Sequence, residues 1–187
     1  DSPQPATPEA FLAAGDQAWA LRAFRELDDA ILRLRLNEPE VGTVVLRATG
    51  DPRAVLAVDA TLQAHGSHWL VREIVNHIRR TLKRVDLTAK TFFALVEPGN
   101  AFAGTLFELV LAADRAYMRH DDDETNTVQL SPMNAGVFPM SNGLSRLQVR
   151  FLGEPGQVDK VLAVAEPIVA PDAAELGLVF SAPDDID

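Results

Sequence analysis

Apolar residues recur along this chain with two different periods, and each period predicts a type of secondary structure. Residues 41–49 and 91–96 are short runs rich in apolar β-branched and aromatic side chains, which predicts two buried strands. Residues 16–36 and 70–85 have apolar side chains three and four positions apart, which predicts long helices with one buried stripe. Because a long helix links the two strands, we expect the strands to pair in parallel. The stripe of the first helix consists of Ala20, Phe24, Leu27, Ile31 and Leu34.

The remaining segments extend this alternation of strands and helices. Residues 53–66 follow Gly50-Asp51-Pro52 and show neither period clearly, so we expect a functional loop there. Repeated strand and helix units favour an α/β fold, in which a mainly parallel sheet is flanked by helices and joined by right-handed crossovers. The further expected helices are 103–115, 144–152, 158–165 and 173–176, and the further strands are 116–118, 128–130 and 178–180.

The length and composition bound the number of domains. A chain of 187 residues that is 47% hydrophobic can bury one substantial core. We expect one domain over residues 16–187, preceded by a linker or terminal segment over residues 1–15. The chain starts with Asp1 and a stretch rich in Pro and Ser, so we expect it to be a piece of a longer protein.

Charge and residue usage exclude several function classes. The chain has 17 Lys and Arg against 27 Asp and Glu, and its net charge of −10 argues against nucleic acid or an anionic membrane as a partner. With no cysteine, it cannot use disulfides or thiol catalysis. His65 and His68 have no third ligand nearby, so no metal site is predicted. No apolar run reaches the roughly 18 residues of a membrane span, and no secretory signal is evident, so a cytoplasmic location is expected.

The best candidate for chemistry lies in residues 92–115. An apolar strand there is followed by a turn of small residues and then by a helix that opens at Gly104 and Thr105. Backbone N–H groups at a helix start bind negative charge, and as an oxyanion hole such donors contribute about 3–4 kcal/mol each to transition-state stabilisation. The alternative is a strand-turn-helix motif that serves packing alone, and small turn residues are common in such motifs.

Several motifs along residues 41–179 resemble those of the crotonase superfamily of enoyl-CoA hydratases and isomerases, and they occur in the same order as in that family. Glu108 and Asp114 have the spacing found in the helix of that family. Residues 136–147 resemble its Gly-x-x-Pro loop, and residues 173–179 resemble its alanine-rich helix that ends in Gly-Leu-Val. Within the superfamily, the sequence most resembles the C-terminal half of the benzoyl-CoA-dihydrodiol lyases. The similar stretches include RELDDAIL, NEPEVGT, ALVEPGNAFAGT and SAPDDID.

The resemblance implies roles for four residues. In crotonases, two backbone N–H groups bind the thioester oxygen, and the matching positions are near Asp59 and at Thr105, with Gly104 in the turn. Glu108 matches the first catalytic glutamate. The second glutamate falls at Pro132, which cannot transfer a proton, so hydration by two carboxylates is not expected.

The resemblance also implies a function. It is that of a crotonase-like domain in a lyase that hydrolytically opens the ring of an oxygenated benzoyl-CoA thioester during aerobic benzoate degradation. An N-terminal crotonase-like half would supply the acid-base groups, while this half serves as scaffold and forms homo-oligomer contacts. No cofactor is implied beyond the coenzyme A of the substrate. Two alternatives remain: a self-sufficient acyl-CoA enzyme that uses Glu108 and the Thr105 amide, and a noncatalytic interaction domain with no cavity beside Thr105.

Overall fold

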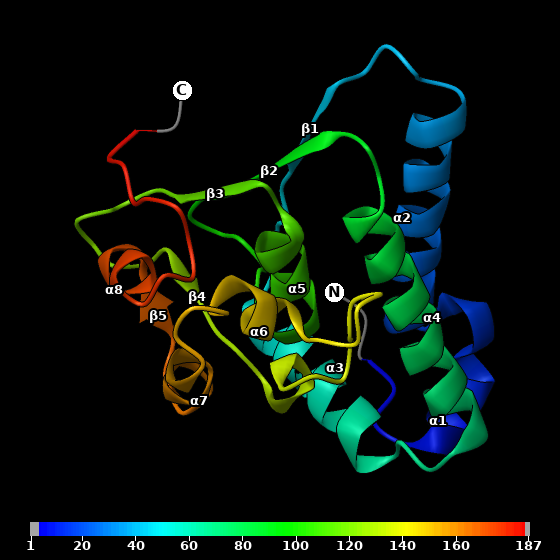
Figure 1. The fold of residues 1–187 in the computed structure, drawn as a ribbon. Coiled ribbons are helices and arrows are strands. Elements are labelled where there is room, and N and C mark those ends of the chain that lie inside the picture. Colours follow the sequence, from blue (N-terminus) through cyan, green and yellow to red (C-terminus); the bar gives the residue numbers. More distant parts are fainter. Residues whose placement is uncertain (1–3, 186–187) are drawn as a thin grey trace.

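A three-stranded parallel sheet lies in the upper part of the computed structural model as Figure 1 shows it, and the structure describes residues 4–185. The sheet has the order β1-β2-β3, formed by Thr43–Leu46, Thr91–Val96 and Arg115–Met118. In register, Val44 lies opposite Phe92, and Phe93 lies opposite Arg115. The predicted parallel pairing of the first two strands is therefore confirmed.

Two long helices, α2 (Trp19–Leu36) and α4 (Trp69–Asp86), stand side by side next to the sheet (Figure 1). Both were predicted from their apolar stripes, and their bounds agree with the prediction to within a few residues. A small antiparallel pair, β4 (Thr127–Val128) with β5 (Ile168–Val169), lies on the other side of the molecule. The other helices are α1 Pro8–Ala14, α3 Pro52–Ala64, α5 Gly104–Ala112, α6 Arg146–Arg150, α7 Gly156–Leu162 and α8 Ala170–Glu175, with 3₁₀ turns at Gly15–Gln17 and Pro132–Asn134.

The core begins before the expected domain boundary at residue 16. Phe11, on α1, is buried and belongs to the same apolar cluster as Phe24 of α2 and Ile78 of α4. Residues 1–3 of the expected linker lie outside the described residues. The described remainder includes a helix, which Thr7 caps by accepting a hydrogen bond from the backbone N–H of Ala10.

The sheet is buried on one face only, whereas the apolar runs predicted fully buried strands. Phe92, Ala94 and Val96 of β2 are fully buried, and they alternate with more accessible residues. Val45 of β1 is 51% exposed, so this short strand has one accessible face. An apolar run does not by itself distinguish a strand buried on two faces from one buried on a single face.

The prediction of a loop over residues 53–66 is wrong, because this segment forms helix α3. Asp51 accepts a hydrogen bond from the backbone N–H of Arg53 at 2.9 Å, and Pro52 occupies the first helical turn. Both are standard helix-start signals. The inward side chains Val55, Val58 and Leu62 then have helical spacing.

The strand predicted at 178–180 does not form as a regular element. Instead, the backbone N–H of Phe180 donates to Ala116 O at 2.7 Å, and Tyr117 and Ser181 form an isolated bridge. The segment therefore runs beside β3 without becoming a fourth strand. The helix expected over 103–115 ends earlier, at Ala112, because Arg115 already belongs to β3. Within residues 4–185, no helix is long and apolar enough to cross a membrane.

Candidate functional site

The N-terminus of α5 brings together the four residues singled out from the sequence. Ala103 has no side chain that can cap the helix, so the first backbone N–H groups of α5 need other acceptors. The N–H of Gly104 donates to Gln129 O at 2.8 Å, and the N–H of Thr105 donates to Asp59 Oδ2, also at 2.8 Å. Thr105 thus faces the 57–60 segment, as expected, but its amide is already bonded to a carboxylate.

Asp59 contributes its side chain to this site. It lies in the interior of α3, where backbone N–H groups bond to carbonyl groups of the preceding turn. Its carboxylate also accepts hydrogen bonds from Thr105 Oγ1 at 2.5 Å and Ser131 Oγ at 2.7 Å. Asp59 therefore caps α5 from a neighbouring helix. The premise that a loop presents its backbone N–H to a ligand does not hold for this residue.

Gly104 allows this close approach. Its φ of 46° lies in the left-handed region, which favours glycine. A Cβ at this position would lie 1.9 Å from Asp59 Oδ2, so any larger residue would displace the carboxylate. Gly104 thus leaves room for the Asp59 carboxylate at the position where the oxygen of a ligand was expected.

Glu108 is buried and held by a polar network. Its Oε1 accepts from Asn134 Nδ2 and its Oε2 from Arg146 Nη1, each at 2.8 Å. Arg146 also donates to both carboxylate oxygens of Asp86, at 3.0 and 2.7 Å. Burial raises the pKa of Glu108, while the positive charge of Arg146 and the Asn134 hydrogen bond offset part of that rise. Glu108 therefore does not face solvent.

Hydrogen bonds from the turn at residues 131–134 connect the carboxylates of Asp59 and Glu108. The resemblance to crotonases places the second glutamate of that family in this turn, at Pro132. Ser131 donates to Asp59 and accepts from the backbone N–H of Met133, while Asn134 bonds to Gly104 O, Glu108 and the Ser131 N–H. Pro132 lies between them at the start of a 3₁₀ turn. This turn therefore supplies hydroxyl and amide groups that hold both carboxylates, and no titratable group.

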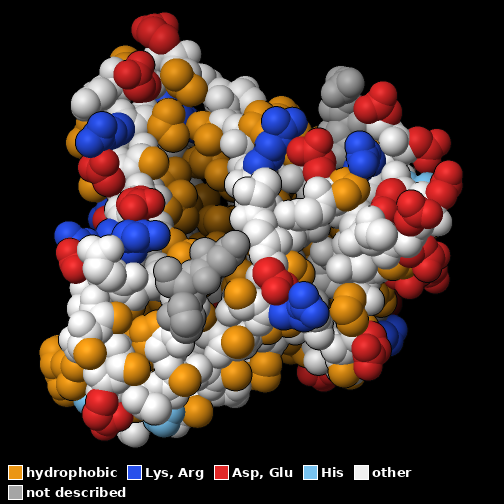
Figure 2. All heavy atoms as spheres, turned by 180° about the vertical axis from the view of Figure 1, so that it is seen from behind, with side chains coloured by type: hydrophobic (Ala, Val, Ile, Leu, Met, Phe, Trp, Pro, Cys, Tyr) orange, Lys and Arg blue, Asp and Glu red, His pale blue; other side chains and the backbone are white. Residues whose placement is uncertain are grey.

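An apolar hollow opens between α2, α3 and the segment that follows β1 (Figure 2). It has a volume of about 390 Å³. Its lining includes Leu106 but neither Thr105 nor Glu108. The main apolar contributors are Trp19, Ala23, Ala48, Val55, Val58 and Leu106.

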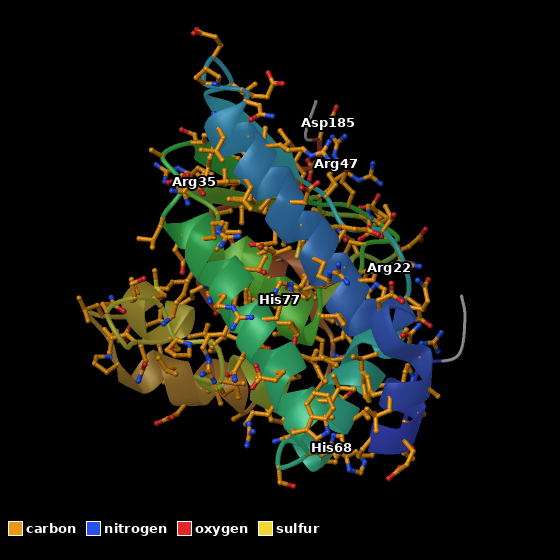
Figure 3. The ribbon with its side chains drawn as sticks, turned by 90° about the vertical axis from the view of Figure 1, so that its right-hand side faces the viewer. Arg22, Arg35, Arg47, His68, His77 and Asp185 are labelled. Carbon is orange, nitrogen blue, oxygen red and sulfur yellow. The ribbon has the colours of Figure 1, made fainter. Side chains whose placement is uncertain are left out.

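The histidines do not form a metal site. Figure 3 places His68 at the start of α4 and His77 about halfway along the same helix. Residues 4–185 contain no group of three or more His, Cys, Asp or Glu side chains that could hold a metal ion. His65 and His68 instead share a backbone hydrogen bond of 2.9 Å, with His68 as donor.

We expect Asp59→Asn to reduce the dependence of folding stability on pH. Burial raises the pKa of Asp59, with hydrogen bonds from Thr105 and Ser131 opposing the rise. The folded state then binds more protons than the unfolded state between the ordinary and the raised pKa, so stability falls as pH rises through that window. Denaturation between about pH 8 and pH 5 should show wild type gaining stability relative to Asp59→Asn as pH falls.

Asp51→Asn is the matched control, because Asp51 lies on the same helix and its pKa is lowered by Arg53. Its difference from wild type should stay constant between pH 8 and pH 5, because the pKa of Asp51 is lowered from 3.8 and the carboxylate is therefore ionised in both the folded and the unfolded state throughout this window. A pH-independent difference for Asp59→Asn would contradict the assignment of a raised pKa.

Comparisons with known proteins connect this geometry to one fold. The chain is 21% identical to the enoyl-CoA hydratase of Bacillus anthracis, with a TM-score of 0.60 over 88% of this chain and 60% of that one. It is 22% identical to AtuE of Pseudomonas aeruginosa, with a TM-score of 0.58 over 88% and 60% of the two chains. The chain has the crotonase fold. The fold expected from the motifs is confirmed, while no family model matches the sequence.

A curated relative confirms the more specific resemblance. The chain is 49% identical, over 176 residues and 94% of its length, to the benzoyl-CoA-dihydrodiol lyase of Aromatoleum evansii. It spans 32% of the length of that lyase. The roles of Asp59, Gly104, Thr105 and Glu108 stay predictions, now with a defined geometry.

Sequence reasoning identified half of the buried network. It placed Glu108 and Thr105 correctly at the α5 start but missed Asp86, Asn134 and Ser131. Arg146 lay inside the recognised Leu144-Ser-Arg-Leu147 motif, which gave its position but not its partners. The capping boxes at Ser131 and Ser145 are the local signals that would have marked both turns.

Proposed function

We propose that this chain is the scaffold domain of a lyase that hydrolytically opens the ring of an oxygenated benzoyl-CoA thioester. The likeness to benzoyl-CoA-dihydrodiol lyase supports the substrate class, and the crotonase fold supports a thioester enzyme. In this proposal, a second crotonase-like half supplies the acid-base groups. This domain supports that half and contributes to oligomer contacts.

The observation that carries the scaffold role is the Asp59 carboxylate at the Thr105 amide. A thioester oxyanion and a carboxylate are both anionic oxygen acceptors, and they cannot share one N–H donor without repulsion. For Thr105 to serve a substrate, Asp59 would have to leave a buried site and lose its hydrogen bonds to Thr105 and Ser131. Each such loss costs about 1–3 kcal/mol, which favours a structural role for this helix start.

Glu108 supports the same conclusion. A general acid or base must reach the reacting atom of the substrate, but both oxygens of Glu108 are bonded to Asn134 and Arg146. The position of the second glutamate is Pro132. Neither carboxylate of the hydratase pair is therefore available in this arrangement.

A second candidate, a self-sufficient acyl-CoA enzyme, draws on two observations. Burial raises the pKa of Glu108 toward the range suited to proton transfer, and the apolar hollow reaches Leu106, next to Thr105. Titration of the chain with benzoyl-CoA separates the two candidates. The scaffold role predicts no saturable binding that depends on the Thr105 amide, whereas saturable binding that Thr105→Pro abolishes would favour the enzyme.

We expect the chain on its own to show no appreciable enoyl-CoA hydratase activity. Each general acid-base group typically contributes about 100-fold to 10,000-fold, and Pro132 removes one of the two. The loss of crotonyl-CoA absorbance, followed with an authentic hydratase as positive control, measures this. Turnover at hydratase rates that disappears in Glu108→Gln would contradict the scaffold role.

In the complete lyase, we expect Glu108→Gln to slow ring opening much less than removal of a glutamate from the other half. An amide at position 108 can still accept from Arg146 or Asn134, so the fold is retained. Replacing an acid-base glutamate of the other half should cost about 100-fold or more. Steady-state rates of both variants on the oxygenated benzoyl-CoA thioester make the comparison, and equal losses would make this domain a direct participant in catalysis.

A further inference from the structure

A cleft of about 600 Å³ lies between the end of α5, helix α6 and helix α8, away from the α5 N-terminus. Its volume is within the range of small-molecule sites, about 300–1,000 Å³. Charged and apolar side chains share its wall. Two carboxylates line it, but Asp86 is paired with Arg146, and Asp114 accepts a hydrogen bond from the backbone N–H of Phe92. The other lining residues used below are Arg115, Arg146, Arg150, Met140, Val149 and Phe180.

Two of the three arginines already have partners. Arg146 is bonded to Glu108 and Asp86 through charged hydrogen bonds. The Arg115 guanidinium lies 4.6 Å from the centre of the Phe180 ring and also donates to Asp114 O. These contacts account for the positions of both side chains without a ligand.

Within residues 4–185, Arg150 differs from Arg146 because it forms no ion pair, and from the exposed Arg115 because it is partly buried. Its Nη1 donates to Gly177 O at 3.1 Å. A guanidinium has five N–H donors, and a partly buried one without an anion is unfavourable. Consistent with this, burial lowers the pKa of Arg150, and no carboxylate opposes the shift.

We propose that this cleft binds a small molecule with an anionic carboxylate or phosphate group, which pairs with Arg150. The guanidinium fork fits two oxygens of either group. Met140, Val149 and Phe180 provide an apolar wall for the rest of the molecule. The chain as a whole carries a net charge of −10 and therefore repels anions, so anion binding in this cleft would have to come from its local positive charge. This site is independent of the scaffold role proposed above.

The test is a titration of the full 187-residue chain, followed by the NMR signals of the arginine side-chain Nε–H groups. Benzoate, acetate and inorganic phosphate are the probes, at constant ionic strength. We expect the Arg150 signal to shift saturably, with a dissociation constant of about 1 mM or lower for the preferred probe. Benzoate binding more tightly than acetate identifies a carboxylate with an apolar body, whereas phosphate binding most tightly identifies a phosphate group.

Arg150→Gln should weaken this binding at least about tenfold, and Arg150→Lys should weaken it less, because lysine keeps the charge but loses the fork. Arg53→Gln, at an exposed arginine on α3, is the matched control and should leave the binding unchanged. Binding that is absent, or equally strong in wild type and Arg150→Gln, overturns the proposal.

A second variant guards against loss of the fold in Arg150→Gln. Val149→Glu keeps Arg150 and places a carboxylate in the cleft wall, where it should compete with the anion. We expect a native circular dichroism spectrum together with at least about tenfold weaker binding. Undiminished binding in a folded Val149→Glu chain would place the anion elsewhere and overturn the proposal.

Discussion

Arg146→Met is expected to lower the free energy of unfolding by about 3–5 kcal/mol, the typical cost of breaking a buried ion pair from one side. The side chain of Arg146 is 1% exposed, and it bridges Glu108 and Asp86, which are nearly as buried. Without the guanidinium, two carboxylates would remain in the interior with no ion-pair partner, and only Asp86 would keep the weaker attraction of Lys83. Their mutual repulsion already contributes to raising the pKa of Glu108.

Urea denaturation of wild type and variant measures this loss. Arg33→Met is the matched control, because Arg33 pairs with Asp29 at 2.8 Å on the surface, where the side chains are 71% and 62% exposed. It should cost less than about 1 kcal/mol. Adding Glu108→Gln to Arg146→Met should recover part of the stability, because it removes one of the stranded charges. A loss no larger than that of the control would show that the network contributes little.

The long elements of the fold follow from the sequence because their signals are local. The stripe that includes Phe24 and Ile31 defines α2, and the apolar run 91–96 defines β2 to the residue. The parallel pairing of β1 with β2 follows from the helical connection between them, which consists of α3 and α4. Local periodicity was sufficient for each of these elements, since the side chains that define it lie within a few turns of one another.

Helix α3 shows where local reasoning was incomplete. The sequence Gly50-Asp51-Pro52 is typical of a turn, but β1 already ends at Leu46, and Asp51 and Pro52 begin a helix. The apolar spacing at Val55, Val58 and Leu62 was then obscured by the alanines between these residues. The error mattered for function, because it assigned a ligand-facing backbone amide to a residue in a helix interior.

The buried network could not be derived from local patterns. Arg146 is 38 residues from Glu108 and 60 from Asp86, and Thr105 is 46 residues from Asp59. Sequence placed Thr105 correctly at a helix start, where an anion is favoured. Whether that anion is a ligand or a side chain depends on long-range packing, and here a carboxylate of the same chain occupies the position.

Gly104→Ala tests whether the α5 start is built around that carboxylate. Alanine at a φ of 46° carries a backbone penalty of about 1–2 kcal/mol. In addition, its Cβ would displace Asp59 Oδ2, and the hydrogen bonds to Thr105 and Ser131 would be lost at about 1–3 kcal/mol each. We therefore expect Gly104→Ala to destabilise the chain by at least about 2 kcal/mol more than backbone strain alone.

Gly99→Ala isolates the strain, because Gly99 also has a positive φ, 81°, but an added Cβ there meets no atom within 4 Å. Asp59→Ala isolates the main clash, since the one further near atom, Ser131 Oγ at 3.0 Å from a Cβ at position 104, ends a rotatable side chain. The cost of Gly104→Ala in the Asp59→Ala background should then fall to about that of Gly99→Ala, which a double-mutant cycle by urea denaturation measures. If the costs of Gly104→Ala and Asp59→Ala simply add, the carboxylate is not what requires glycine at this position, and the Thr105 amide is free to be considered again as a binding group for a thioester.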